Sequence, residues 1–172
     1  MDEQQLALVV RAKKGDSAAF GELYEGYANE LYRFALYMVG RPEDAEDAVQ
    51  DAVISAWQNL PSLRDNALFK PWLFKVLSNT CKTALAKRGK QPALYGDDEA
   101  VFLLTDADAG YSFQSAELKE AIASLGEPDA RIILLSVLGG FKSSELAVIF
   151  DMVPATVRSR QKRALEKLRA VL

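Results

Sequence analysis

The sequence of 172 residues contains no histidine and only one cysteine, Cys81. Histidine is the commonest general base and the commonest metal ligand, so its absence removes the usual means of acid–base catalysis and metal binding. A single cysteine excludes an internal disulfide and argues against a cysteine-based metal cluster. We therefore expect no catalytic residues, no metal site and no cofactor, although an active site built only from carboxylates or lysine stays open at this point.

Long apolar segments are also missing. No run approaches the roughly 18 apolar residues that a membrane-spanning helix needs. The first residues, Met1 to Gln5, are acidic and polar, whereas a secretory signal starts with basic residues and an apolar stretch. With 49% hydrophobic and 26% charged residues, the composition is that of a globular protein with one ordinary domain or two small ones. The sequence predicts a cytoplasmic protein without membrane insertion.

The charge is unevenly distributed. The net charge is −3 and the pI is about 5.1, values that are unusual for a DNA-binding protein. Residues 66–90 nevertheless contain six cations and no acid, and residues 154–172 contain six cations against Glu166 alone. Acidic residues collect in 43–51 and again in 97–108. Separate patches of opposite sign predict separate partners, a polyanion at the basic patches and a protein at the acidic ones.

Apolar residues recur at three- and four-residue steps, the spacing of an α-helix, and no stretch alternates as a strand would. Asp16 or Ser17 is placed to cap the first of these helices, and Gly40 to end it. Residues 59–68 contain Pro61 and polar residues and are expected to form mainly a loop, with room for a short helix. The expected helices span residues 16–40, 42–57, 71–87, 116–125, 128–138, 143–150 and 154–172.

These elements predict an all-α fold of two small helical domains joined by a flexible linker. We assign residues 1–88 to the first domain, 89–115 to the linker and 116–172 to the second domain. The linker assignment rests on a proline, glycines and acids that interrupt the helical pattern. An apolar island at 101–104 leaves two interpretations open, a segment that docks on one domain and a linker that threads through a partner.

Residues 142–160 have the character of a helix-turn-helix motif. Ser143 or Ser144 can cap a short helix, a tight turn follows, and Pro154 suits the first turn of the next helix. That last helix is expected to bury one apolar face, formed by Val157, Ala164, Leu168 and Val171.

A second face of the last helix carries hydroxyls at its N-terminal end and cations after them. A recognition helix has this order, because its first turns enter the major groove while longer cations reach phosphates. The alternative is a solvated basic face on an ordinary helix, which the preceding short helix and turn make less favourable. The candidate DNA-binding residues here are Thr156, Arg158, Ser159, Arg160, Lys162, Arg163 and Lys167.

The helix expected at 42–57 has an acidic face opposite its apolar one, and an isoleucine lies within that acidic face. An aliphatic side chain among carboxylates suits a protein-binding surface with a small hydrophobic anchor. A lone exposed aliphatic residue is also ordinary, so both interpretations stay open on the residues alone. The candidate protein-binding residues are Asp47, Gln50, Asp51 and Ile54.

The helix expected from Pro71 carries cations, an amide and hydroxyls, Ser78 among them, opposite its apolar face. Such a face can follow a nucleic-acid backbone and read a base edge. The loop at 59–68 adds polar groups able to hydrogen-bond an extruded base, which needs a receiving pocket. The alternatives are a solubilising helix face and a loop that only connects. The candidates for this second nucleic-acid surface are Asn59, Ser62, Arg64, Asn66, Lys75, Asn79, Lys82, Lys87 and Arg88.

Taken in order, these segments resemble the extracytoplasmic-function class of bacterial RNA polymerase sigma factors over nearly the whole chain. No single segment is decisive, whereas all of them in this order and at this length are specific. The family often has Asp and Arg where Thr83 and Ala86 stand, so promoter specificity at this helix is expected to differ from the family pattern. The matching segments are Gly15-Asp16-x-x-Ala19-Phe20-x-x-Leu23-Tyr24, Ala45 to Trp57, Trp72-Leu73-x-x-Val76-Leu77-x-Asn79, Leu118 to Leu125, Arg131, Ser144 to Ala147, and Thr156 to Arg169.

The resemblance implies a sigma factor that binds core RNA polymerase, directs it to specific promoters and assists promoter melting. The helix at 42–57 would contact core polymerase, residues 59–88 the melted minus-ten strand, and the last helix the double-stranded minus-thirty-five element. An anti-sigma factor is the expected inhibitor. Binding energy would open the DNA, because the chain has no glycine-rich nucleotide-binding loop ending in Lys-Ser or Lys-Thr.

Two other functions stay open. A sigma mimic would sequester an anti-sigma factor without binding DNA, but it has no need of the cations Arg160 and Arg163. A stand-alone helix-turn-helix repressor would leave the acidic face around Asp51 and the basic helix from Pro71 unexplained.

Overall fold

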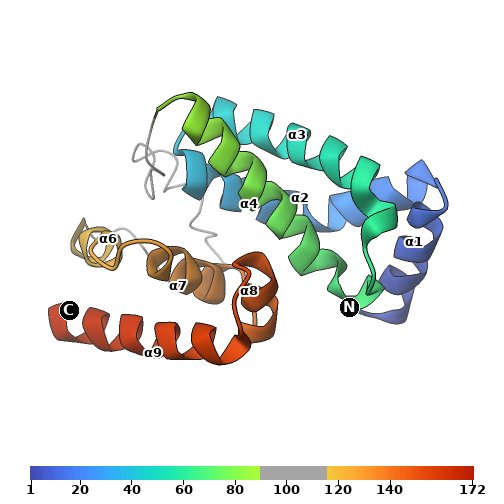
Figure 1. Cartoon of the computed structure of the whole chain (residues 1–172). Helices are drawn as coiled ribbons and strands as arrows, with labels where there is room; N and C mark the ends of the chain where they lie inside the picture. Colours follow the sequence, from blue (N-terminus) through green and yellow to red (C-terminus); the bar gives the residue numbers. More distant parts are fainter. Residues whose placement is uncertain (90–115) are drawn as a thin grey trace.

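The computed structural model describes residues 1–89 and 116–172 (Figure 1). Every regular element in these two ranges is helical, which confirms the predicted all-α fold. No described helix combines the length and apolar character needed to cross a membrane. The predicted linker lies outside the described residues apart from Gly89, and so does its apolar island. In chain order the elements are α1 (Glu3–Lys13), α2 (Ser17–Val39), α3 (Pro42–Asn59), η1 (Leu60–Ser62), η2 (Asn66–Leu68), α4 (Phe69–Lys87), α6 (Ala116–Ala123), α7 (Asp129–Leu138), α8 (Ser143–Ile149) and α9 (Pro154–Val171).

Helix boundaries in the first half follow signals in the sequence. Asp16 caps α2, because its carboxylate accepts a hydrogen bond from the Ala19 amide at 3.1 Å. Gly40 ends α2 in the left-handed conformation, with φ of 79°, which costs glycine little. Pro42 occupies the first turn of α3, where the missing N–H has no intrahelical acceptor. The expected capping by Asp16 and termination at Gly40 are confirmed.

No helix was expected before Asp16, yet α1 forms there. Its start is a capping box, in which the Asp2 carboxylate accepts from the Gln5 amide at 2.8 Å. The Gln5 side chain in turn accepts from the Asp2 amide at 3.3 Å. The Asp-x-x-Gln spacing was therefore a usable signal. The residues that α1 buries are Leu8, Val9 and Ala12.

The stretch expected to be mainly a loop contains two short 3-10 helices, η1 and η2. α4 begins at Phe69, two residues before its expected start at Pro71. Pro71 is tolerated because first-turn N–H groups have no acceptor inside the helix. The Phe69 side chain is fully buried and lies 6.2 Å from the Tyr27 ring, and this packing supports the earlier start.

Helices α2, α3 and α4 pack around one core, and α1 packs against α2 (Figure 1). Aromatic pairs contribute to that core. Phe34 of α2 meets Phe74 of α4 edge to face with ring centroids 5.9 Å apart, and Phe20 lies 5.1 Å from Trp57 of α3. This packing holds α3 and α4 beside each other, so their outer faces lie close together.

In the second half, α7 and α8 both pack against α9. The cap of α8 differs from the expected one, because neither Ser143 nor Ser144 provides it. Lys142 is the N-cap residue, and its amide donates to the Glu145 carboxylate at 2.8 Å. The Ser143 hydroxyl donates instead to Gln161 Oε1 of α9 at 3.0 Å, a bond that ties α8 to α9.

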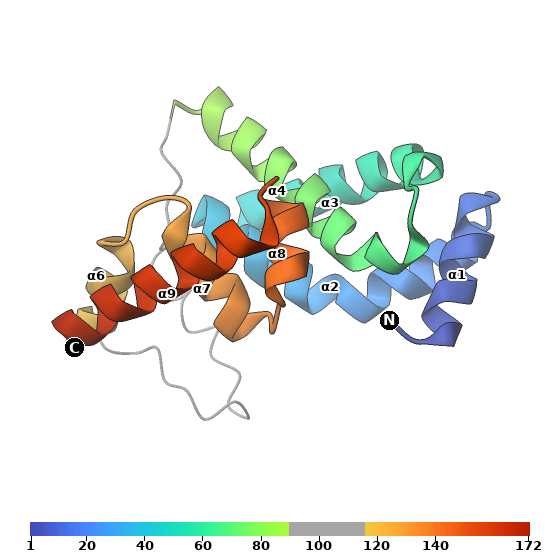
Figure 2. The ribbon, with the colours of Figure 1, turned by 60° about the horizontal axis from the view of Figure 1, so that its bottom comes forward.

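The two halves of the chain touch, with α8 lying against α4 (Figures 1 and 2). Phe74 of α4 meets Phe141, which precedes α8, edge to face at 4.8 Å. The Nζ of Lys75, also in α4, lies 2.7 Å from Oδ1 of Asp151, which follows α8. These four residues define what we call the interdomain contact.

A buried arginine lies beside the interdomain contact. Arg131 of α7 is only 8% exposed, and its guanidinium reaches the Met38 sulfur of α2 at 3.3 Å. Its charge is balanced by an ion pair with Glu127 one turn earlier, and its cation lies 5.3 Å from the Phe150 ring. The residues on either side of the undescribed segment therefore share a continuous core.

Candidate nucleic-acid and protein interfaces

The four candidate protein-binding residues lie together on the exposed face of α3. Ile54 is 57% exposed, and the exposed residues Asp51, Gln50 and Asp47 lie three, four and seven positions before it, on the same side of the helix. We call these four residues the acidic row. The opposite face of α3 is buried in the core and consists mostly of small residues, Ala45, Ala48, Val49, Ala52 and Ala56.

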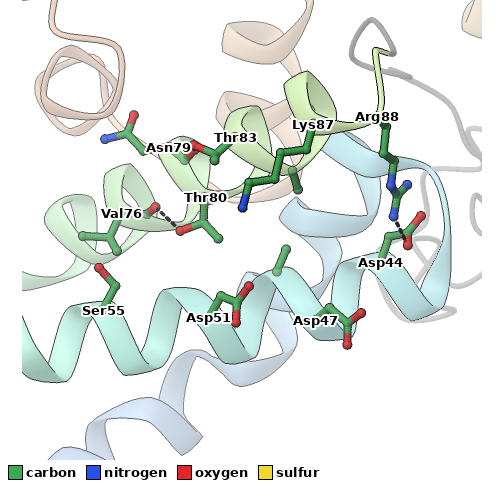
Figure 3. Close-up of a pocket in the computed structure, with 12 residues that line it drawn as sticks. Asp44, Asp47, Asp51, Ser55, Val76, Asn79, Thr80, Thr83, Lys87 and Arg88 are labelled. Atoms are coloured by element: carbon green, nitrogen blue, oxygen red, sulfur yellow. Dashed lines mark hydrogen bonds and ion pairs between the residues drawn. The ribbon is translucent and has the colours of Figure 1, made fainter.

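An open groove of about 630 Å³ lies between α3 and α4 (Figure 3). Asp47 and Asp51 line it from α3, while Asn79, Thr83 and Lys87 line it from α4. The sequence suggested two independent surfaces, one acidic and one basic. The structure instead makes parts of both the walls of one groove, so a molecule bound there would meet carboxylates on one side and a cation with polar groups on the other.

Arg88, a candidate DNA contact, is paired with Asp44 at the start of α3 (Figure 3). The hydrogen bond to the Asp44 carboxylate raises the pKa of the Arg88 guanidinium above its already high value. The Asp44 side chain is largely buried, and its Oδ2 has no partner among the described residues. Arg88 thus ties the end of α4 to the start of α3, and a phosphate would have to compete with Asp44 for it.

Three of the four candidates within α4 are exposed: Asn79, Lys82 and Lys87. The fourth, Lys75, is partly covered and paired with Asp151. Ser78 was also expected on the exposed side, and this expectation is wrong: Ser78 is 1% exposed, and its hydroxyl has no partner in the described part of the chain. The helical register places Ser78 one turn beyond Phe74 and Lys75, so the docked second half covers it.

The candidates in residues 59–68 divide by exposure. The exposed ones are Asn59, Ser62 and Arg64. The Ser62 hydroxyl donates to the Asn59 carbonyl at 2.6 Å, and the Asn59 amide donates to the Ser55 carbonyl at 2.8 Å. Asn66 is half-buried, and its side-chain oxygen accepts a hydrogen bond from Lys13. Internal hydrogen bonds therefore shape this loop.

Lys13, the last residue of α1, was not among the candidates. Its Nζ donates to the Leu63 carbonyl at 2.6 Å and to Asn66 Oδ1 at 3.0 Å. The Leu63 side chain is buried, so the loop is anchored at both its backbone and its apolar side chain. The partners are 50 and 53 positions away in sequence, and no local pattern signals a contact of that range.

The helix-turn-helix geometry is present in α8, the turn after it and α9. Asp151 in the turn has φ of 53°, a conformation that aspartate and asparagine tolerate better than most residues. Val157, Ala164 and Leu168 are buried as expected. Val171 is 67% exposed, contrary to expectation, because it ends the helix beyond the last buried position.

Six of the seven candidates on α9 are exposed: Thr156, Arg158, Ser159, Lys162, Arg163 and Lys167. The seventh, Arg160, is partly buried, and its guanidinium donates to Asp129 Oδ1 of α7 at 2.8 Å. The Nε of Arg160 is buried and has no partner among the described residues. Arg160 therefore connects α9 to α7 and differs from the exposed Arg163, one turn away.

The described residues contain no group of three or more His, Cys, Asp and Glu side chains able to hold a metal ion. Cys81 is buried in α4, and this burial raises the pKa of its thiol to about 12. The thiolate, which is the reactive form, is therefore strongly disfavoured at neutral pH.

Comparison with known proteins identifies both halves. The family model for Sigma-70 region 2 matches residues 23–91, and that for Sigma-70 region 4 matches residues 115–168. The first match contains the acidic row and all the candidates between Asn59 and Arg88, which we call the second basic surface. The second match contains the candidates on the exposed face of α9.

Proteins of similar sequence or fold match this chain over nearly its full length. The ECF RNA polymerase sigma-E factor of Haemophilus influenzae is 33% identical over 174 residues, covering 94% of this chain and 92% of that protein. The fold is similar to that of CnrH in complex with the cytosolic domain of CnrY, with a TM-score of 0.74 and 22% identity over 98% of this chain and 97% of CnrH. The sigma factor RpoE of Bartonella quintana, solved with the anti-sigma factor NepR, has a TM-score of 0.66 and 24% identity over 88% and 95% of the two chains. The chain therefore belongs to the extracytoplasmic-function RNA polymerase sigma factors, and it acts in promoter-specific transcription initiation.

Proposed function

We propose that the protein directs initiation through three separate surfaces. The acidic row on α3 binds core RNA polymerase. The loop at 59–68 and the exposed face of α4 hold the melted minus-ten strand, and the exposed face of α9 binds the double-stranded minus-thirty-five element. The protein has no catalytic step of its own, and binding energy drives strand opening.

The observation that carries this proposal is the simultaneous exposure of one acidic and two basic faces on helices whose opposite faces are buried. Carboxylates around an exposed aliphatic side chain suit a protein partner, because the aliphatic group supplies apolar area and the charges supply specificity. Cations with hydroxyls suit DNA, because phosphates attract the cations and base edges form hydrogen bonds with the hydroxyls.

The second basic surface fits a single strand better than a duplex. Lys82 and Lys87 offer cations along the outer side of α4, and Asn59, Ser62 and Arg64 offer hydrogen-bonding groups in the preceding loop. Extruding a base from a stack costs a few kcal/mol, so a polar loop that receives the base lowers the cost of opening. The cations then hold the backbone of the same strand.

An anti-sigma factor is the proposed inhibitor. The similar Bartonella quintana sigma factor was solved with such a partner. A protein that covers the acidic row would prevent polymerase binding without touching DNA. The proposed localisation is cytoplasmic, because the protein acts on RNA polymerase, which is in the cytoplasm.

The deciding experiment is run-off transcription with purified core polymerase on a genomic promoter library. We expect transcripts from a defined subset of promoters only when this protein is added. A sigma mimic or a stand-alone repressor would yield none, and core polymerase saturated with another sigma factor serves as the positive control.

A further inference from the structure

We propose that Lys13 is a positioning residue for minus-ten recognition, because it fixes the loop at 59–68 and turns the Asn66 amide so that its hydrogens face the extruded base. This inference rests on the proposed role of the loop. It adds a residue outside the loop and a chemical preference for the base that the loop receives.

Lys13 anchors the loop through two hydrogen bonds. Its ammonium group donates to Leu63 O at 2.6 Å and to Asn66 Oδ1 at 3.0 Å, and both bonds are partly shielded from water. Neither acceptor carries a charge, so the contact is not a surface ion pair that salt would screen. Without the lysine both oxygens would lose their donor, and the Asn66 amide would be free to rotate.

The chemistry of an ammonium group fixes the orientation of Asn66. Lysine has three donors and no acceptor, so only the carbonyl oxygen of the Asn66 amide can face it. The Nδ2 group then points away from Lys13. No described residue accepts a hydrogen bond from Nδ2, so its hydrogens are available to a ligand.

An outward-facing NH₂ group selects for acceptors on the base. A carbonyl oxygen of guanine, cytosine or thymine can accept a hydrogen bond from Nδ2 alone. Adenine has no carbonyl oxygen, and asparagine recognises it through two bonds, one from the NH₂ group to a ring nitrogen and one from the adenine amino group to the amide oxygen. Lys13 already occupies that amide oxygen, so the second bond to adenine is lost. The geometry therefore favours a carbonyl-bearing base over adenine at the position that the loop receives. If Asn66 could rotate freely, either face of the amide would be available and this preference would weaken.

The test measures base preference as well as total activity. Premelted promoters are prepared in which each minus-ten position carries each of the four bases in turn, and initiation by core polymerase with the sigma factor is measured. Lys13→Met should lower initiation on the best template by about five- to tenfold, the effect of one or two lost part-buried hydrogen bonds. It should also reduce discrimination against adenine at one position.

Two variants serve as matched controls. Lys14→Met removes the same charge from the exposed neighbouring residue, which makes no described side-chain contact, and should leave the base profile unchanged. Lys13→Arg keeps a donor and should retain most of the discrimination. Core binding and thermal melting are measured for every variant.

Asn66→Asp gives a positive test that does not require loss of a contact. One carboxylate oxygen keeps the bond to Lys13 while the other presents an acceptor outward. The preference should therefore shift away from thymine and toward bases with an exocyclic amino group, adenine included. Lys13→Met combined with Asn66→Ala should cost less than the sum of the two single changes, because part of the effect of Lys13 acts through Asn66 and the rest through the Leu63 carbonyl.

The outcomes separate this inference from the function on which it rests. If Asn66→Ala and Asn66→Asp both leave initiation and the base profile unchanged, the proposed role of the loop is wrong. If they change the profile while Lys13→Met does not, the loop is the receiver and the inference about Lys13 is overturned. Lower stability of Lys13→Met with an unchanged profile would also overturn it, because that result indicates a merely structural lysine.

Discussion

Two arginines one turn apart on α9 illustrate how differently similar residues can be held. Arg163 is exposed, and its Nε makes a long 3.4 Å bond to the Ser159 carbonyl. Arg160 is bonded to Asp129 of α7 and keeps a buried Nε. The two side chains are chemically identical, so nothing in the sequence distinguishes them. The distinction arises from Asp129, a residue on another helix.

We expect Arg163→Ala and Arg160→Ala to differ in what they lose. Arg163→Ala should weaken minus-thirty-five binding by roughly 1–3 kcal/mol if it reads a base, or uniformly across sequences with a shallower salt slope if it contacts phosphate. Arg160→Ala should in addition lower the free energy of unfolding by about 1–2 kcal/mol, because Asp129 loses its partner. Footprinting and thermal melting measure the two effects, and an Arg160→Ala protein of unchanged stability would contradict the second.

Cys81 should react slowly in the folded protein. Desolvation raises the pKa of its thiol to about 12, and the reactive thiolate is therefore scarce at neutral pH. Labelling by a thiol reagent should be on the order of 100-fold slower than in urea, because it requires local opening of α4. A mass-spectrometric time course measures the rate, and rapid labelling of native protein would show that α4 is not packed as described.

At the scale of elements, helix boundaries could be predicted from the sequence where a nearby residue caps or ends the helix. Asp16, Gly40 and Pro42 mark the ends of α2 and the start of α3, and the apolar spacing supplies the rest. The same reasoning placed the acidic row on one exposed face. The Asp2–Gln5 capping box is equally local and should have predicted α1.

Expectations failed where a distant element decides the outcome. Ser78 is buried because the second half docks on α4, and α4 begins early because Phe69 packs on α2. The Ser143 hydroxyl forms a hydrogen bond with Gln161 of α9 and does not cap its own helix. The contacts of Lys13 bridge about a third of the chain, a range over which periodicity carries no information.

The acidic row yields a prediction that concerns one helix face. Asp51→Arg combined with Ile54→Glu should abolish binding to core polymerase, because charge reversal and loss of the apolar anchor at a desolvated contact cost about 2–5 kcal/mol. The fold should be kept, since both side chains are exposed. Co-purification with core enzyme is the assay, and Glu22→Arg on the exposed side of α2 is the control. Undiminished co-purification of the double variant would refute the assignment.

At the scale of the whole molecule, the interdomain contact gives Lys75 two competing partners. In the structure it is bonded to Asp151, and in the proposed function it faces the minus-ten strand. The hydrogen bond from Lys75 lowers the pKa of Asp151 from its ordinary value of 3.8. The closed arrangement therefore binds fewer protons than the open one, so this ion pair is fully formed above pH 3.8 and is lost as the pH falls through the lowered pKa.

Asp151→Asn should shift the protein toward open arrangements. Asparagine tolerates the positive φ of residue 151, so the turn is preserved while the charge that holds Lys75 is removed. We expect a larger radius of gyration in small-angle scattering and tighter binding of single-stranded minus-ten DNA. Glu25→Gln, which removes a carboxylate from the exposed side of α2, controls for the change in net charge. If scattering and DNA affinity match the unsubstituted protein, the ion pair does not restrain the two halves.

The contact between α4 and α8 also bears on how a protein with basic surfaces moves through a cell full of DNA. A genome offers millions of non-specific sites, and the two exposed basic surfaces are attracted to all of them. In the closed arrangement Lys75 is bonded to Asp151, so each non-specific contact with DNA has one cation fewer. Free copies of the protein would thus leave non-specific DNA sooner and have more time to encounter polymerase, because Asp151 competes with DNA phosphates for Lys75.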